Sequence, residues 1–331
     1  MSGGGAFESM VSAVSTSGTR TLMGMFSGKR LKKLLPCKPL EDALKDAKSQ
    51  CAGFNNFNHE YPCDNVSARW VVEAKERRPE DPIIVYFHGG GYVLDILFPE
   101  VTFIASLYQQ VANPRLSVLM LDYSTAPTHQ YPVAIREAVD LYRQLTEVDL
   151  CTNIILLGDS AGGNLALTLT AHYHYTHPEI PSLSGSIAPK ALILISPWLN
   201  LIPERKGSYE KNESKDCMTH AILERWAKLY APSEEDRASM WCSPLHAAPE
   251  IWKDCLPEQT LMLWGQNEVT FDDLQQFASK LGLKYTEVEP NGVHDSIMFP
   301  MPQLFTSLKL TGDRMSNKIF SRIVSYLKDT M

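Results

Sequence analysis

The chain has 331 residues, 44% of them hydrophobic and 21% charged, with a formal net charge of −7. This length suffices for one large α/β domain with a sizeable core. The acidic balance argues against a duplex nucleic-acid partner, which requires a basic face, so we expect a small-molecule partner. Seven cysteines without C-x-x-C spacing indicate neither a disulfide framework nor a metal site. No signal peptide or stretch of ~18 apolar residues stands out, which predicts a cytoplasmic protein without a membrane span.

In chain order, short apolar segments bounded by turn residues predict the strands of a central sheet. Most of them are continuously hydrophobic, as in strands of a parallel sheet that are buried on both faces. The first and the last alternate more and suit the edges. The predicted strands are 68–74, 82–87, 116–121, 153–157, 190–195, 260–264 and 284–288.

Helical patterns fall between these strands, which predicts βαβ crossovers. One is 133–148, which Pro132 opens, and another follows Ser160. The alternation fails over about 1–60 and about 199–256, where a helical pattern occupies 220–231. We therefore predict a single domain over 1–331 whose helical cap comes from the N-terminus and from this insertion.

The segment 21–35 combines a basic face with Leu, Met and Phe side chains. Such a pattern suits a peripheral contact with an anionic membrane surface. It also suits a cap helix that packs over a pocket. The sequence leaves both interpretations open.

The segment GDSAGG lies between a predicted strand and a predicted helix, and it fits the pattern G-x-S-x-G. In that context the motif forms a strained turn that presents the serine hydroxyl above the sheet. The N–H of Ala161, in the first turn of the helix, faces the place where negative charge develops during acyl transfer. A tight turn with an incidental serine is the alternative, but the features below favour Ser160 as a nucleophile.

The segment His88-Gly89-Gly90-Gly91 directly follows the predicted strand 82–87. It places backbone N–H groups at the end of a neighbouring strand, and we predict that Gly89 and Gly90 complete an oxyanion hole with Ala161. His88 braces this glycine loop in our interpretation.

A serine nucleophile needs a base, and an acid must orient that base. Of nine histidines, His294 alone lies in a loop after the last predicted strand, at the edge of the sheet where Ser160 lies. Glu268 comes first after the strand 260–264 and is our predicted acid. Asp272 is the alternative, although its position suits the start of the next helix.

Together, HGGG, the segment 121–132, GDSAGGNLAL and the pattern H-x-x-x-x-F from His294 to Phe299 resemble the hormone-sensitive-lipase-like branch of the α/β hydrolases. The resemblance implies the α/β-hydrolase fold, a helical cap and a Ser160, Glu268 and His294 triad, without cofactor or metal. It also implies that Asp122, Tyr123 and Pro127 support the glycine loop. The chain departs from the family at Glu268-Val269-Thr270, where Asp-Pro-Leu is frequent.

These features predict a serine carboxylic ester hydrolase that acts through an acyl-enzyme, with an amidase or formamidase as the alternative. A less favoured third interpretation is a ligand-binding protein on a disabled hydrolase fold. SPWLNL at 196–201 and the aromatic-rich cap resemble fungal sterol deacetylases, so we expect short-acyl esters, acetyl included, of an apolar alcohol. Aromatic residues that could line the pocket are Phe54, Phe57, Trp198, Tyr209, Trp226, Tyr230 and Trp241. Nothing in the sequence predicts the oligomeric state.

Overall fold

A seven-stranded sheet forms the centre of the computed structural model, which describes residues 17–21, 23–25, 32, 37–298 and 317–331. Its strand order is β2-β5-β3-β6-β7-β8-β9. Only β2 runs antiparallel to its neighbour, and every other pair in this sheet is parallel. The strands are β2 (Ala68–Val72), β3 (Ile83–Phe87), β5 (Ser117–Leu121), β6 (Ile154–Asp159), β7 (Ala191–Ile195), β8 (Gln259–Gly265) and β9 (Tyr285–Glu289).

All seven predicted strands are confirmed, and their hydrophobicity explains their places in the sheet. The central strands β3, β5, β6 and β7 are buried along their whole length, because helices cover both faces of the sheet. The more polar β2 and β9 lie at the two edges, as predicted. A further pair of two-residue strands, β1 (Cys37–Lys38) and β4 (Ile96–Leu97), was not expected.

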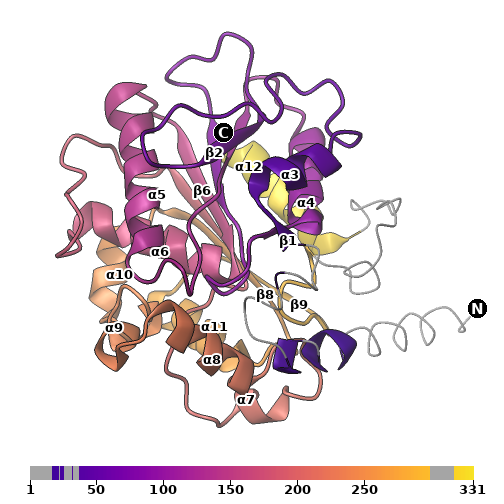
Figure 1. Cartoon of the computed structure of the whole chain (residues 1–331), viewed down its shortest axis with the longest axis vertical. Helices are drawn as coiled ribbons and strands as arrows, with labels where there is room; N and C mark the ends of the chain where they lie inside the picture. The colour runs from indigo at the N-terminus through magenta and orange to yellow at the C-terminus, as the bar shows by residue number, and fades with distance from the viewer. Residues whose placement is uncertain (1–16, 22, 26–31, 33–36, 299–316) are drawn as a thin grey trace, which may run out of the picture.

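Helices form a layer on each face of the sheet (Figure 1). One layer holds α3 (Leu40–Asp46), α4 (Phe98–Val111) and α12 (Lys318–Thr330), which contact one another through α4. The other holds α5 (Val133–Arg143), α6 (Ser160–His174), α10 (Pro249–Cys255) and α11 (Phe271–Leu281). The predicted helix 133–148 continues past α5 as a π-helical turn over Gln144–Val148. This arrangement confirms the α/β-hydrolase fold.

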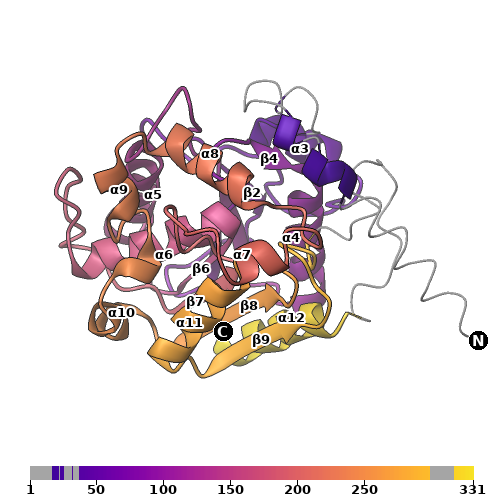
Figure 2. The ribbon, with the colours of Figure 1, turned by 90° about the horizontal axis from the view of Figure 1, so that it is seen from below.

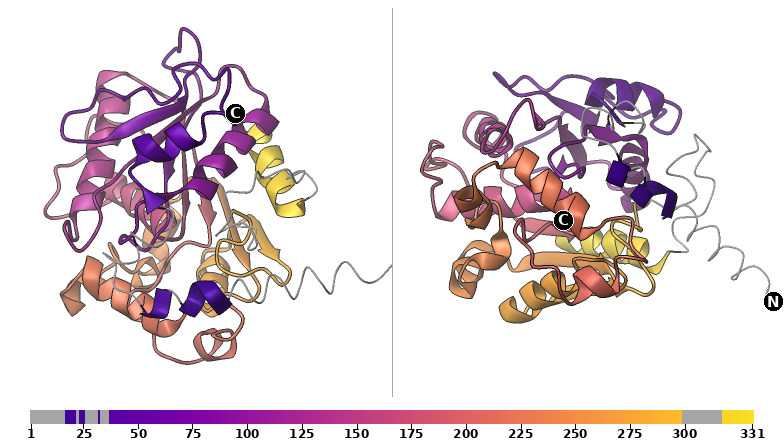
Figure 3. Two further views of the ribbon diagram at one scale, coloured as in Figure 1. Left: turned by 45° about the vertical axis from the view of Figure 1, so that its right-hand side comes forward. Right: turned by 60° about the horizontal axis from the view of Figure 1, so that its bottom comes forward.

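The insertion contributes helices at the edge of the sheet where the parallel strands end. These helices are α7 (Ser208–Lys211), α8 (His220–Tyr230) and α9 (Glu234–Ala238), and Figure 2 shows them from that edge. Residues 17–21 and 23–25 lie beside them (Figure 3). Arg225 of α8 donates hydrogen bonds to the carbonyls of Met23 and Gly24, and Arg20 donates to the carbonyl of Ser214 at 3.0 Å. The N-terminal segment is therefore attached to the insertion.

Two other described helices of the predicted cap segments, α3 and α10, pack elsewhere. Helix α3 packs against α4 and β2, on the flank of the sheet, and α10 packs against α6 and α11. Most of 21–35, the segment considered for membrane contact, lies outside the described residues. None of the helices in the described part of the chain has the length and apolar character that a bilayer crossing requires.

Candidate active site

Ser160 lies at the turn from β6 to α6, as the G-x-S-x-G motif predicts. Its φ of +48° is in the left-handed region, which strains a residue with a side chain. The flanking glycines permit the turn, because a Cβ at Gly158 would overlap the carbonyl of Gly162, and a Cβ at Gly162 would overlap the carbonyl of Phe87 in β3. The N–H of Trp198 donates to the carbonyl of Ser160 at 2.9 Å and holds the turn from the β7 side.

His294 reaches this serine from the loop after β9. Its Nε2 is 2.9 Å from Oγ of Ser160. The backbone N–H of His294 donates to Asp216 at 3.0 Å, and the N–H of Val269 donates to the other oxygen of the same carboxylate at 2.7 Å. Asp216, which is completely buried and which the sequence analysis missed, therefore joins the histidine loop to the loop of the acid.

Glu268 holds the opposite nitrogen of His294, with 3.1 Å between its Oε2 and Nδ1. The same carboxylate accepts hydrogen bonds from Oγ of Ser196 at 2.6 Å, from the N–H of Gly265 at 2.5 Å and from Oγ1 of Thr270 at 3.0 Å. Its side chain is fully buried. The structure thus brings together the three predicted residues Ser160, His294 and Glu268 in the arrangement of a catalytic triad.

The alternative acid, Asp272, does not contact the histidine. Its carboxylate accepts a hydrogen bond from the N–H of Ser208, in α7, at 2.8 Å. A Cβ on Gly207 would overlap the same carboxylate. Asp272 therefore attaches α7 to the start of α11, which is the helix-terminus role that its position suggested.

The environment of His294 strongly favours its protonated form. Burial lowers the pKa of this side chain, but the carboxylates of Asp295, Glu268 and Asp216 outweigh burial and raise the pKa from 6.5 to about 10. An imidazolium formed when His294 accepts a proton from Ser160 is accordingly stabilised within the site.

The glycine loop differs from the prediction in one donor. The N–H of Gly89 donates to the buried carboxylate of Glu100, in α4, at 3.3 Å. This bond argues against Gly89 as an oxyanion donor. Among the described residues no acceptor engages the N–H of Gly90, Gly91 or Ala161.

Gly91 must be a glycine for two reasons. Its φ is +61°, and a Cβ there would overlap the indole ring of Trp226. The cap helix α8 therefore contacts the glycine loop directly through the indole of Trp226.

His88 braces this loop, as predicted. Its ring stacks on Tyr123 with 4.2 Å between ring centroids, and its Nδ1 is 2.8 Å from the carbonyl of Gly89. Burial lowers the pKa of His88 from 6.5 to about 4, so the ring is neutral at physiological pH. Tyr123, of the D-Y-x-x-A-P segment, donates its hydroxyl to the carbonyl of His88 at 2.7 Å.

Asn164, one helical turn after Ser160, connects three segments around the site. Its Nδ2 donates to the carbonyls of Trp198 at 2.7 Å and Cys242 at 2.8 Å, and its Oδ1 accepts from the hydroxyl of Tyr92 at 2.7 Å. The side chain is completely buried with its hydrogen bonds satisfied. No motif in the sequence marks Asn164, although a lone amide within the hydrophobic run NLALTLTA was a signal.

The aromatic residues proposed for the pocket separate into two groups. Trp226 lies against Gly91, Tyr230 stacks on Tyr92 with 3.8 Å between centroids, and Trp198 holds the turn at Ser160. The other four aromatic residues have partners away from Ser160. Phe54 contacts Tyr108 and Trp241 contacts His177. Tyr209 donates a hydrogen bond to Asp273, and Phe57 packs against the hydrophobic core. Only the first group borders the glycine loop and the serine.

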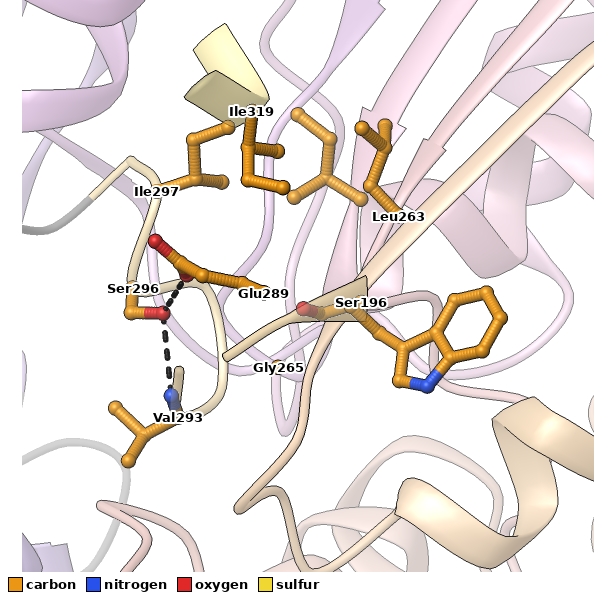
Figure 4. A pocket seen from close by; sticks show the side chains of 10 residues that line it. Ser196, Leu263, Gly265, Glu289, Val293, Ser296, Ile297 and Ile319 are labelled. Atoms are coloured by element: carbon orange, nitrogen blue, oxygen red, sulfur yellow. Dashed lines mark hydrogen bonds between the residues drawn. The ribbon is translucent and has the colours of Figure 1, made fainter. Parts of the chain in front are cut away.

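Behind the triad, the strand ends and the histidine loop pack closely. A cavity of only about 10 Å³ remains between β7, β8 and the loop, lined by Ser196, Leu263 and Ile297 among others (Figure 4). Ser296 donates to the carboxylate of Glu289 and accepts from the N–H of Val293 at 3.1 Å. The loop that carries His294 is therefore held by its packing against β7 and β8 and by the hydrogen bonds of Ser296 to Glu289 and Val293.

A family model described as steryl acetyl hydrolase matches residues 33–298 of the chain. The chain belongs to the steryl acetyl hydrolase family. It is 32% identical to "Putative steryl acetyl hydrolase mug81" of Schizosaccharomyces pombe, over 69% of this chain and 61% of that one. It is also 32% identical to steryl acetyl hydrolase 1 of Saccharomyces cerevisiae, over 57% and 45% respectively. The matched region thus covers less than two thirds of either yeast relative.

Solved structures similar to this steryl acetyl hydrolase family member include esterases. The esterase of Pyrobaculum calidifontis superposes with a TM-score of 0.71 at 20% identity, covering 94% of this chain and 97% of that one. A thermostable esterase of Pseudomonas putida gives a TM-score of 0.68 at 18% identity, covering 95% and 94%. At these identities the likeness establishes the shared fold.

Proposed function

We propose that the chain is a serine carboxylic ester hydrolase. The observation that carries this proposal is the continuous line from Oγ of Ser160 through the imidazole of His294 to the buried carboxylate of Glu268. A ligand-binding protein on a disabled hydrolase fold would be expected to lack part of this line, whereas all three groups are present and in contact.

In the proposed reaction, Nε2 of His294 takes the proton of Ser160 as Oγ attacks the ester carbonyl. Collapse of the tetrahedral intermediate breaks the bond to the alcohol, which receives the proton from His294. Water then repeats the sequence on the acyl-enzyme and releases the carboxylic acid. Glu268 keeps Nδ1 protonated, so that Nε2 is the basic nitrogen.

The oxyanion is bound, in this proposal, by the N–H groups of Gly90, Gly91 and Ala161. The free state of these N–H groups supports this assignment, and the bond from Gly89 to Glu100 supports replacing Gly89 with Gly91. Preorganised donors of this kind typically contribute about 3 kcal/mol each to transition-state stabilisation.

For the substrate, we propose an acetyl or other short-acyl ester of a bulky apolar alcohol, such as a sterol. Three observations support this choice: the family description, the names of the yeast relatives, and the indole of Trp226 against the glycine loop. Residues 17–21 and 23–25 together with α7, α8 and α9 form the cap over this substrate. A cytoplasmic location remains part of the proposal.

The test is hydrolysis of p-nitrophenyl esters from acetate to a long acyl chain, with a steryl acetate and an anilide of acetic acid in parallel. Wild type is compared with Ser160→Ala and with Ser106→Ala, a matched change on α4, on the flank of the sheet. We expect Ser160→Ala to lower kcat by about 10⁴-fold or more and Ser106→Ala to leave it unchanged. Full activity in Ser160→Ala, or a folded wild type inactive on every ester, would refute the proposal, and faster turnover of the anilide would identify an amidase.

A further inference from the structure

A second carboxylate contacts the histidine of the triad. Oδ2 of Asp295 is 3.3 Å from Nε2 of His294, the same nitrogen that is 2.9 Å from Oγ of Ser160. The proposed reaction uses one carboxylate, Glu268, on the opposite nitrogen. Asp295 therefore competes with Ser160 for the nitrogen that has to act as the base.

Asp295 is held firmly in this position. It is 5% exposed, its φ is +53°, and its N–H donates to Oγ of Ser196 at 3.3 Å. Ser196 is the residue whose hydroxyl donates to Glu268. The two carboxylates on the imidazole are thus positioned through one serine at the end of β7.

The surroundings of Asp295 are acidic apart from His294. Oδ1 of Asp295 has no hydrogen-bond partner among the described residues. The titratable groups that interact with the pair are Glu268, Asp216, Asp159, Glu100, the phenol of Tyr86 and the thiol of Cys217. Burial raises the pKa of Asp295 and outweighs the opposite effect of His294, and the carboxylates of Asp159, Glu268 and Asp216 raise this pKa further. An unpaired buried carboxylate is costly, so a proton between Asp295 and His294 relieves the site.

We propose that Asp295 and His294 share one proton between Oδ2 and Nε2, and that this pair withholds the base from Ser160 until the proton is lost. Wherever the shared proton resides, the lone pair of Nε2 is engaged by Asp295. Activation consists of transfer of that proton to water, with no other bond formed or broken. Asp295 is accordingly a positioning residue that moves the onset of activity above pH 6.5, the ordinary imidazole value. The catalytic part of this inference rests on the proposed esterase function.

The variant that tests the pair is Asp295→Asn, since asparagine has the same size and adopts positive φ readily. We expect the acidic limb of the profile of kcat/KM against pH to move down by about one unit or more, which is roughly tenfold in rate below the limb. Asp272→Asn is the matched control, because it removes an exposed carboxylate that does not contact His294. A limb that stays in place in Asp295→Asn, as in the control, would overturn the proposal.

A second measurement does not depend on activity. The ¹⁵N signals of the His294 imidazole are titrated in Ser160→Ala with and without Asp295→Asn. A His294 titration that moves to lower pH in Ser160→Ala with Asp295→Asn, compared with Ser160→Ala alone, supports the shared proton. This holds even if wild type hydrolyses no ester, because inactivity of wild type would refute only the esterase function. An active enzyme whose His294 titration is unmoved refutes only the pair. If the asparagine variant does not fold, Asp295→Gly, which the positive φ favours, takes its place.

Discussion

Replacing Glu268 with glutamine should disable the triad through the tautomer of His294. From the described residues the carboxylate accepts four hydrogen bonds, two on each oxygen: Oε1 from Ser196 and Gly265, and Oε2 from His294 and Thr270. A glutamine offers only one acceptor oxygen. With that oxygen kept at Ser196 and Gly265, the amide NH₂ faces Nδ1 of His294, which can then accept only if it carries no proton.

The imidazole is consequently protonated on Nε2, which cannot take the proton of Ser160. The equivalent change of aspartate to asparagine in serine-protease triads lowers kcat by about 10⁴-fold. At 1.36 kcal/mol per tenfold, that loss corresponds to about 5.4 kcal/mol of transition-state stabilisation. We expect a similar loss for Glu268→Gln, with kcat measured on p-nitrophenyl acetate and folding checked by a thermal melting curve.

Asp272→Asn provides the comparison, because Asp272 was the alternative acid and bonds to α7 instead. Its kcat should stay within about twofold of wild type, in line with a surface substitution. Retention of a tenth or more of the wild-type kcat by folded Glu268→Gln would exclude this role for Glu268. A larger loss in Asp272→Asn than in Glu268→Gln would exclude it as well.

Two further changes test the glycine loop. Gly91→Ala combines a positive φ with overlap on Trp226, whereas Gly282→Ala has nearly the same φ and open space around it. Urea unfolding should therefore show Gly91→Ala to be less stable than Gly282→Ala by about 1–3 kcal/mol. Equal losses of stability in the two variants would contradict the close approach of α8. The pKa of His88 falls from 6.5 to about 4 on folding. As the pH is lowered, the unfolded chain therefore binds a proton at His88 before the folded chain does. The free energy of unfolding that His88 contributes above pH 6.5 is thus lost as the pH falls toward 4. Between pH 7 and 4, His88→Gln should therefore lose about 3 kcal/mol less of its unfolding free energy than wild type. If the unfolding free energies of the two proteins change in parallel with pH, a neutral buried His88 is excluded.

The sheet and the grouping of Ser160, Glu268 and His294 could be predicted because their signals are local. Strands buried on both faces read as continuous apolar runs, and the positions of Ser160, Glu268 and His294 just after strand ends bring them to one edge of the sheet. The order of motifs along the chain was sufficient for this part of the site.

The missed features depend on contacts between segments distant in sequence. In the sequence Gly89 is indistinguishable from Gly90 and Gly91 as an oxyanion donor. In the structure its N–H donates to Glu100, in the first turn of α4. Asp216 lies in an irregular part of the insertion, and no pattern around it indicates that it joins two catalytic loops. The packing of α3 on α4 is likewise a contact that only the folded chain shows.

The position of Asn164 has a consequence for the evolution of specificity. One amide group hydrogen-bonds the tyrosine after the glycine loop, the main chain after β7 and the main chain of the insertion. Substitutions in these three segments are therefore not independent, because each one moves a partner of the same side chain. Mutant libraries that vary all three at once should show strong epistasis, and keeping Asn164 fixed should preserve the largest share of folded members.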